Sequence, residues 1–167
     1  MRLLLLALLL SGCAEYTTTR YQPAHLRVYL HGHVESGCRC AGREGEVDAV
    51  FMAVDDALQG DATPHRWGSG PITVCLVESR PYVVCGGYAL AGCSYIDRVF
   101  VSSVYDVSDG GVPQGYDWRR TMVHEFIGLL AMRGGLRGVE RGQGAEWEAA
   151  LVASEPYRRV STRVALW

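Results

Sequence analysis

The first ten residues limit which part of this chain can belong to a folded domain. A short basic start, Met1-Arg2, precedes an unbroken apolar run from Leu3 to Leu10. A membrane-spanning helix needs about 20 apolar residues, so this run is too short to span a bilayer and matches the apolar core of a signal peptide. We therefore expect export, and the remainder of a 167-residue chain is long enough for one domain.

The residues that follow, Leu10-Ser11-Gly12-Cys13, resemble the lipobox of bacterial lipoproteins. The resemblance implies that residues 1–12 are a cleaved signal peptide and that Cys13 carries the lipid, such as palmitate. Residues 13–24 then form a polar tether that holds the protein to the membrane through this lipid. Ala14 resembles an outer-membrane sorting signal, so the expected location is the bacterial cell envelope, facing the periplasm or the surface. An ordinary secretory signal with a chance cysteine is the alternative.

Composition narrows the class of partner. Hydrophobic residues make up 49% of the chain, which is enough for a packed core. All 16 basic residues are arginine, and they are balanced by 18 acidic residues to a net charge of -2. A protein that binds nucleic acid through phosphates needs a concentrated basic face, so we expect no nucleic-acid partner.

Export places the other five cysteines in an oxidising compartment, where disulfides form. Cys85 and Cys93 bracket a Gly-rich loop, CGGYALAGC, and are the expected pair. Cys75 can then join Cys38 or Cys40, which leaves one cysteine unpaired.

A metal site near the N-terminal end of the domain is a second interpretation of these cysteines. His31-Gly-His33 precedes Cys38-Arg-Cys40, and His and Cys at such spacing can bind zinc. The oxidising compartment favours disulfides over thiolate ligands, so we expect loop residues and a structural disulfide instead.

Hydrophobic periodicity predicts a small α/β or α+β domain over residues 25–167. The expected strands cover residues 25–32, 71–77 and 96–101, with a hairpin extension at 82–84, and the expected helices cover 46–59, 118–132 and 145–154. We expect a mixed sheet packed on two main helices and stabilised by disulfides. Asp117 is the expected N-cap of the long helix, and Gly134-Gly135 its end.

The long helix contains His124-Glu125-Phe-Ile-Gly128, which resembles the H-E-x-x-H helix of the zincin metallopeptidases. In that family two histidines at i and i+4 bind zinc, and the intervening Glu acts as general base on the metal-bound water. The run GCSYIDRVFVSS upstream also resembles the zincin edge strand that borders the substrate. The resemblance implies a small zincin-like domain in which His124 is a zinc ligand and Glu125 the catalytic base.

The motif departs from the family at its second histidine, where this chain has Gly128. A catalytic zinc normally keeps three protein ligands and a water. In one zincin branch a Glu on a following helix is the third ligand, and Glu146, Glu148 and also Glu140 stand at a suitable distance downstream. His124 and one of these carboxylates would still make only two ligands.

Three functions remain open at this stage. The first is a lipid-anchored, catalytically impaired peptidase homologue that acts by binding a peptide or another envelope protein, with the peptide along the edge strand. The second is an active zinc metallopeptidase that uses His124, Glu125 and a downstream Glu. The third is a structural lipoprotein without enzyme activity, of unrelated fold, in which His124 is a hydrogen-bonded core residue.

Overall fold

The computed structural model describes residues 28–30, 43–64, 66–67, 72–77, 81–104 and 116–164. The predictions that concern Cys13, His31, His33, Cys38 and Cys40 lie outside these ranges.

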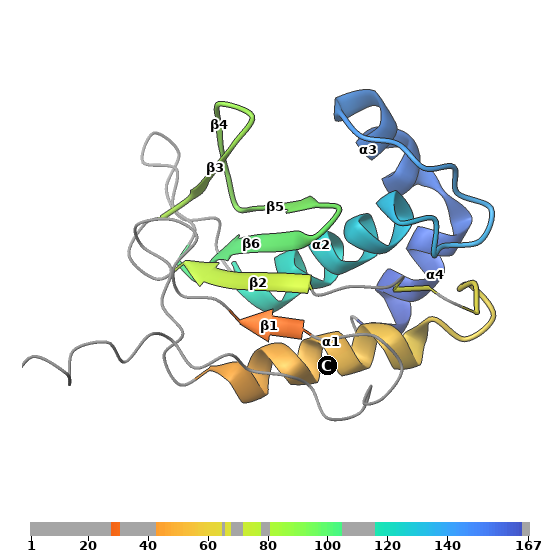
Figure 1. The fold of residues 1–167 in the computed structure, drawn as a ribbon, viewed down its shortest axis with the longest axis horizontal. Helices are drawn as coiled ribbons and strands as arrows, with labels where there is room; N and C mark the ends of the chain where they lie inside the picture. Colours follow the sequence, from red (N-terminus) through yellow and green to blue (C-terminus); the bar gives the residue numbers. More distant parts are fainter. Residues whose placement is uncertain are drawn as a thin grey trace, which may run out of the picture.

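Six strands and four helices make up the described part of the chain (Figure 1). In chain order they are β1 (Val28–Leu30), α1 (Glu44–Ala57), β2 (Ile72–Val77), β3 (Val83–Cys85), β4 (Tyr88–Leu90), β5 (Gly92–Tyr95), β6 (Arg98–Ser102), α2 (Trp118–Met132), α3 (Ala145–Ala153) and α4 (Glu155–Val164). The mixed α+β content that the sequence predicts is confirmed.

The main sheet has the strand order β1-β2-β6-β5. Strands β1, β2 and β6 run parallel, whereas β5 pairs antiparallel with β6 and stands at the edge of the sheet. The predicted mixed sheet is therefore confirmed. The run that the sequence suggested as one edge strand is divided by a turn at Ile96-Asp97 into β5 and β6, so the edge strand is β5 alone.

Helices α1 and α2 pack together on one face of this sheet (Figure 1). The alternating residues Ile72, Val74 and Leu76 of β2 point toward the helices and are buried. The aromatic rings of Phe51 and Phe126 meet edge to face, with centroids 5.2 Å apart. Burying such rings excludes water from a large apolar area, so this interface forms the main core.

The opposite face of the sheet carries the small β3–β4 hairpin. Its inner side and the sheet enclose a second apolar cluster that includes Cys75, Phe100 and Cys85. The predicted disulfide between Cys85 and Cys93 is present and ties the hairpin to β5. Cys75 is also disulfide-bonded, and the proposed partners Cys38 and Cys40 lie outside the described residues.

Helix α2 has the bounds that the sequence predicts, residues 118–132. The Asp117 side chain caps it by accepting a hydrogen bond from the Arg119 backbone N–H at 3.0 Å. Gly134 follows the helix with φ +74°, a left-handed conformation that favours glycine and stops the helix. Trp118, Met122, Phe126 and most of the last two turns are buried.

Four helices stand where the sequence predicted two main ones and a short third, because residues 155–164 form the unforeseen helix α4. Its buried residues Tyr157, Val160 and Val164 are spaced three and four apart, which is a helical pattern. Pro156 lies in the first turn, where a proline costs no helical hydrogen bond.

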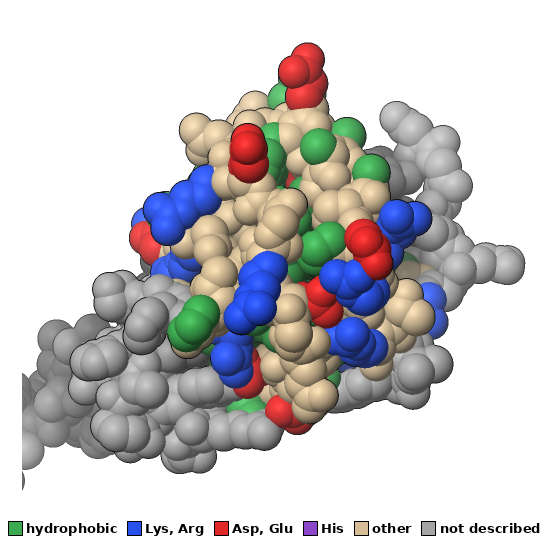
Figure 2. Space-filling view, turned by 90° about the vertical axis from the view of Figure 1, so that its right-hand side faces the viewer, with side chains coloured by type: hydrophobic (Ala, Val, Ile, Leu, Met, Phe, Trp, Pro, Cys, Tyr) green, Lys and Arg blue, Asp and Glu red, His purple; other side chains and the backbone are tan. Residues whose placement is uncertain are grey.

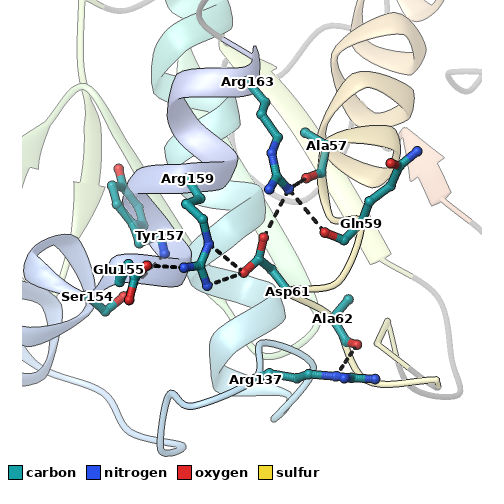
Figure 3. Close-up of polar contacts among 10 residues, drawn as sticks. All are labelled: Ala57, Gln59, Asp61, Ala62, Arg137, Ser154, Glu155, Tyr157, Arg159 and Arg163. Atoms are coloured by element: carbon teal, nitrogen blue, oxygen red, sulfur yellow. Dashed lines mark hydrogen bonds and ion pairs between the residues drawn. The ribbon is translucent and has the colours of Figure 1, made fainter.

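Asp61 anchors α4 to the loop after α1 (Figure 3). Its buried carboxylate accepts hydrogen bonds from Arg159 at 2.6 Å and from Arg163 at 3.0 Å, and Arg163 also donates to the Ala57 carbonyl at 2.6 Å. A buried carboxylate is tolerated because these guanidinium groups compensate its charge. On this side of the molecule arginine and acidic side chains alternate and form no continuous basic patch (Figure 2).

In the part of the chain that the structure describes, no helix combines the length and the apolar character needed to cross a membrane.

Candidate functional site

Helix α2 directs His124 and Glu125 toward different neighbours. Adjacent residues on an α-helix point about 100° apart. His124 faces α3 and α4, whereas the carboxyl of Glu125 faces β5. The two residues of the sequence motif therefore belong to two contact regions that share one helix.

The imidazole ring of His124 is engaged at both nitrogens. Nε2 lies 2.8 Å from Oε1 of Glu148 on α3, and Nδ1 lies 2.6 Å from the hydroxyl of Tyr157 on α4. Oε1 of Glu148 is buried, and its close contact among the described residues is this one with His124. The sequence prediction that a carboxylate downstream meets His124 thus leads to Glu148, while Glu146 is exposed in the first turn of α3.

Charge and burial act in opposite directions on the pKa of His124. Burial of the ring lowers the pKa, because it penalises the charged imidazolium. The contact with Glu148 and the negative charges of Glu148 and Glu125 outweigh this effect, so the pKa of His124 is raised above its ordinary value of 6.5. The site therefore favours an imidazolium beside the Glu148 carboxylate.

Tyr157 is the site residue that the sequence analysis missed. Its burial raises the pKa of the phenol, and the Ser161 side chain, one turn further along α4, hydrogen-bonds to it. Tyr157 lies on α4, the helix whose Arg159 and Arg163 are bound by Asp61 of the loop after α1 (Figure 3). The signal that reveals Tyr157 is the apolar spacing 157, 160 and 164, which marks it as the inward-facing aromatic residue of a helix.

Glu125 is buried against β5, with 7% of its surface exposed. Burial raises its pKa to about 7, and the nearby positive charge of His124 and a hydrogen bond with the Ser94 side chain only partly oppose this. Glu125 is therefore a carboxyl group that exchanges its proton close to neutral pH.

Two glycines let β5 approach α2 this closely. A Cβ atom added at Gly92 would lie 2.7 Å from the Thr121 side chain and 3.0 Å from a Glu125 oxygen. A Cβ atom added at Gly128 would lie 3.0 Å from the Ser94 hydroxyl oxygen. Gly128 is therefore not simply a missing ligand, because the space where a second histidine would project is occupied by β5.

The donors at this site do not fit the zinc ion that the H-E-x-x-H resemblance implies. Two ligands each about 2.0 Å from a tetrahedral zinc lie about 3.3 Å apart, whereas His124 and Glu148 are in direct contact at 2.8 Å. Tyr157 contacts the other ring nitrogen. Within the described ranges no group of three or more His, Cys, Asp or Glu side chains is placed to hold a metal.

Comparison with known proteins adds no family: no family model, no curated protein and no solved structure matches this chain. The site must therefore be interpreted from its own residues.

We predict that Glu125→Gln alters how stability depends on pH. The native pKa near 7 lies above the ordinary value of 4.5, so between these values the folded state binds more protons than the unfolded state. The free energy of unfolding therefore falls as pH rises through this window, by about 3 kcal/mol in total. The variant has no carboxyl to ionise, so it should match the wild type near pH 4 and exceed it at pH 8, as measured by urea denaturation.

The matched control is Glu140→Gln, which removes an exposed carboxylate outside the site. Its stability profile should run parallel to that of the wild type. The raised pKa of His124 also makes stability fall with rising pH; this part should persist in Glu140→Gln and become smaller in Glu125→Gln, which removes one of the negative charges that raise it. If the stability profile of Glu125→Gln ran parallel to that of the wild type, the raised pKa of the buried Glu125 carboxyl would be contradicted.

Proposed function

We propose that this chain is a lipid-anchored envelope protein with a zincin-like domain that has lost its zinc site and acts by binding an extended peptide along β5. The observation that carries this proposal is that the Ser94 hydroxyl oxygen lies 3.0 Å from the place where a side chain at position 128 would begin. That contact fills the place of the second zinc ligand with a strand whose outer edge pairs with no strand in the described part of the chain.

The arrangement around α2 supports the zincin-like part of the proposal. The helix that bears His124 and Glu125 packs directly against the antiparallel edge strand of a mixed sheet. A carboxylate from a later helix, Glu148, meets the histidine. The motif resemblance implies the same arrangement of helix, edge strand and downstream carboxylate, with a second histidine ligand that this chain lacks.

The hydrogen-bonding pattern of β5 supports the peptide-binding part. The Ser102 N–H donates to the Ala91 carbonyl at 2.9 Å, so in this antiparallel pair the alternate residues Cys93 and Tyr95 also turn their backbone groups toward β6. The backbone groups of Gly92 and Ser94 therefore face outward. In the described part of the chain no strand pairs with this edge, and an unpaired edge of this kind can accept an added strand.

The side chains around this edge suggest what such a peptide is like. Leu90, Tyr95 and Ile96 are large hydrophobic residues exposed near the strand. The acidic residues Glu146 and Glu148 stand on α3, whose Leu151 lies close to Gly128. We therefore expect an extended peptide with β-branched residues and a basic side chain.

The first test measures binding of an acetylated and amidated strand peptide, Thr-Val-Lys-Val-Thr, to the full chain by fluorescence anisotropy. Ser94→Pro removes an outward N–H and should weaken binding by about tenfold, because proline cannot donate to an added strand. Proline is tolerated on an edge strand, so the fold should persist.

The matched control is Ala89→Pro, which alters an exposed position on β4 away from the proposed binding edge. It should leave peptide affinity unchanged. Equal loss of affinity in both variants, or no binding by the wild type, would exclude β5 as the binding edge.

The alternative function is an active zinc metallopeptidase that uses His124, Glu125 and Glu148; in its favour, Glu148 of α3 does lie beside His124, although a zinc ion would have to separate the two. The two proposals differ in the metal content of the purified full chain. Our proposal predicts no tightly bound zinc in the wild type. One equivalent of zinc that is lost in His124→Ala, with proteolysis that is lost in Glu125→Ala, would establish the alternative instead.

A double variant tests the zincin-like geometry itself. Ser94→Gly with Gly128→His both clears the space beside α2 and completes the H-E-x-x-H pattern. With Glu148 as third ligand it should gain one equivalent of zinc. The triple variant that adds Glu148→Gln should lose it, whereas a double variant that folds without binding zinc would contradict the zincin-like arrangement.

The lipid anchor is tested separately through Cys13. Cys13→Ser removes the proposed lipid attachment and should move the protein from the membrane fraction to the soluble fraction, because an exported chain without the acyl groups lacks their apolar contact with the bilayer. Cell fractionation with immunoblotting measures this. Cys75→Ser is the control, and membrane association that survives Cys13→Ser would remove the lipoprotein part of the proposal.

A further inference from the structure

A pocket of about 300 Å³ lies among α1, the start of α2 and the end of α4, outside the contacts of His124 and Glu125. Its lining residues are Val50, Asp117, Arg119, Arg120, Val123, Ser161, Thr162 and Val164. Cavities that take small molecules start at about this volume.

One part of the lining is aliphatic. Val50, Val123 and Val164 come from three different helices and are largely buried, so the pocket wall is apolar and set by the core packing. The hydroxyl groups of Ser161 and Thr162 lie beside them. None of the described lining residues is aromatic, so among them there is no stacking platform that a base or a sugar ring would use.

The charges at the pocket are unevenly paired. Both nearby carboxylates, Glu46 and Asp117, contact Arg119, and the Asp117 carboxylate also caps α2. Arg120 lines the same pocket, and its guanidinium has no carboxylate partner within the described residues. Among the described lining residues, one cation is therefore free to meet a single negative charge.

The pocket is connected to the candidate site through α4. Ser161 hydrogen-bonds to Tyr157, and the Tyr157 hydroxyl lies 2.6 Å from Nδ1 of His124. Val123, on the pocket wall, directly precedes His124. A molecule in the pocket would thus contact α2, which carries His124, and α4, which carries Tyr157.

We propose that this pocket binds a small aliphatic monocarboxylic acid. The carboxylate would pair with Arg120 and accept hydrogen bonds from Ser161 and Thr162, while the hydrocarbon chain would lie against the three valines. A phosphate carries a second negative charge that a single unpaired guanidinium does not match, so a monoanion fits better. The apolar wall favours a ligand with several methylene groups over acetate or formate.

The experiment titrates the full chain with hexanoate and follows backbone amide shifts by NMR. Saturable shifts at Arg120, Val123 and Thr162 are expected. Hexylammonium has the same chain with opposite charge and should bind at least tenfold more weakly, and 1-hexanol should be intermediate. Equal affinity for hexanoate and hexylammonium, or no saturable binding of hexanoate, would overturn the proposal.

Two arginine variants test whether the hexanoate carboxylate pairs with Arg120. Arg120→Gln should weaken hexanoate binding by about tenfold, because it removes a charge-assisted hydrogen bond. Arg141→Gln, which changes an exposed arginine beyond the other end of α2, should have no effect. Equal affinities of these two variants would exclude Arg120 as the carboxylate partner and with it the proposal.

A pocket-filling variant keeps the proposal falsifiable if Arg120→Gln disturbs the helix. Thr162→Trp introduces bulk from an exposed position on the rim and should abolish binding while the far-ultraviolet circular dichroism stays unchanged. Undiminished binding to a folded Thr162→Trp variant would overturn the proposal. So would hexanoate binding that occurs only after residues 165–167 are deleted, because the chain itself would then occupy the pocket.

Discussion

The direct contact between β5 and α2 decides what the rest of the site can be. Gly92 and Gly128 lie on the two sides of this contact, and a side chain at either position would crowd the side chains of Thr121 and Glu125 or of Ser94. Because the strand lies so close, the Glu125 carboxyl loses its water and its pKa rises to about 7. The same closeness puts Ser94 where a second metal-binding histidine would project.

A second constraint comes from the opposite side of α2. Asp61 binds two arginines of α4. The same helix carries Tyr157, whose hydroxyl contacts His124, a residue 33 positions earlier in the sequence. The imidazole ring is then held between a phenol and a carboxylate. A histidine with both nitrogens engaged has a fixed orientation, which makes it a structural centre of the junction between α2, α3 and α4.

The sequence was sufficient for the elements whose signals are local. Asp117 and Gly134 mark the ends of α2, and the Gly-rich loop between Cys85 and Cys93 predicts their disulfide. Helix α4 could not be predicted with the same ease, because its stability depends on Asp61, a partner about a hundred residues away. Propensity gives little guidance when tertiary contacts provide most of the stability.

The meaning of Gly128 is the part of the site that no local pattern could reveal. In the sequence it is the absence of a ligand, and the motif does not say which residue lies beside it. In the structure, a Cβ atom added at Gly128 would lie 3.0 Å from the Ser94 hydroxyl oxygen. Such a contact joins residues 34 positions apart, so it follows from the strand order of the sheet and not from the spacing of the motif.

The disulfide between Cys85 and Cys93 has a consequence for this contact beyond ordinary stabilisation. Strand β5, Gly92-Cys93-Ser94-Tyr95, is short and has little contrast between its two faces, so its hydrophobic pattern specifies the register only weakly. A slip by one residue would turn Cys93 and Tyr95 toward α2 and move Ser94 away from Glu125. The bond to Cys85 holds Cys93 on the hairpin side of the sheet. Together with the ladder to β6, this bond therefore helps to hold the register in which Ser94 faces Glu125.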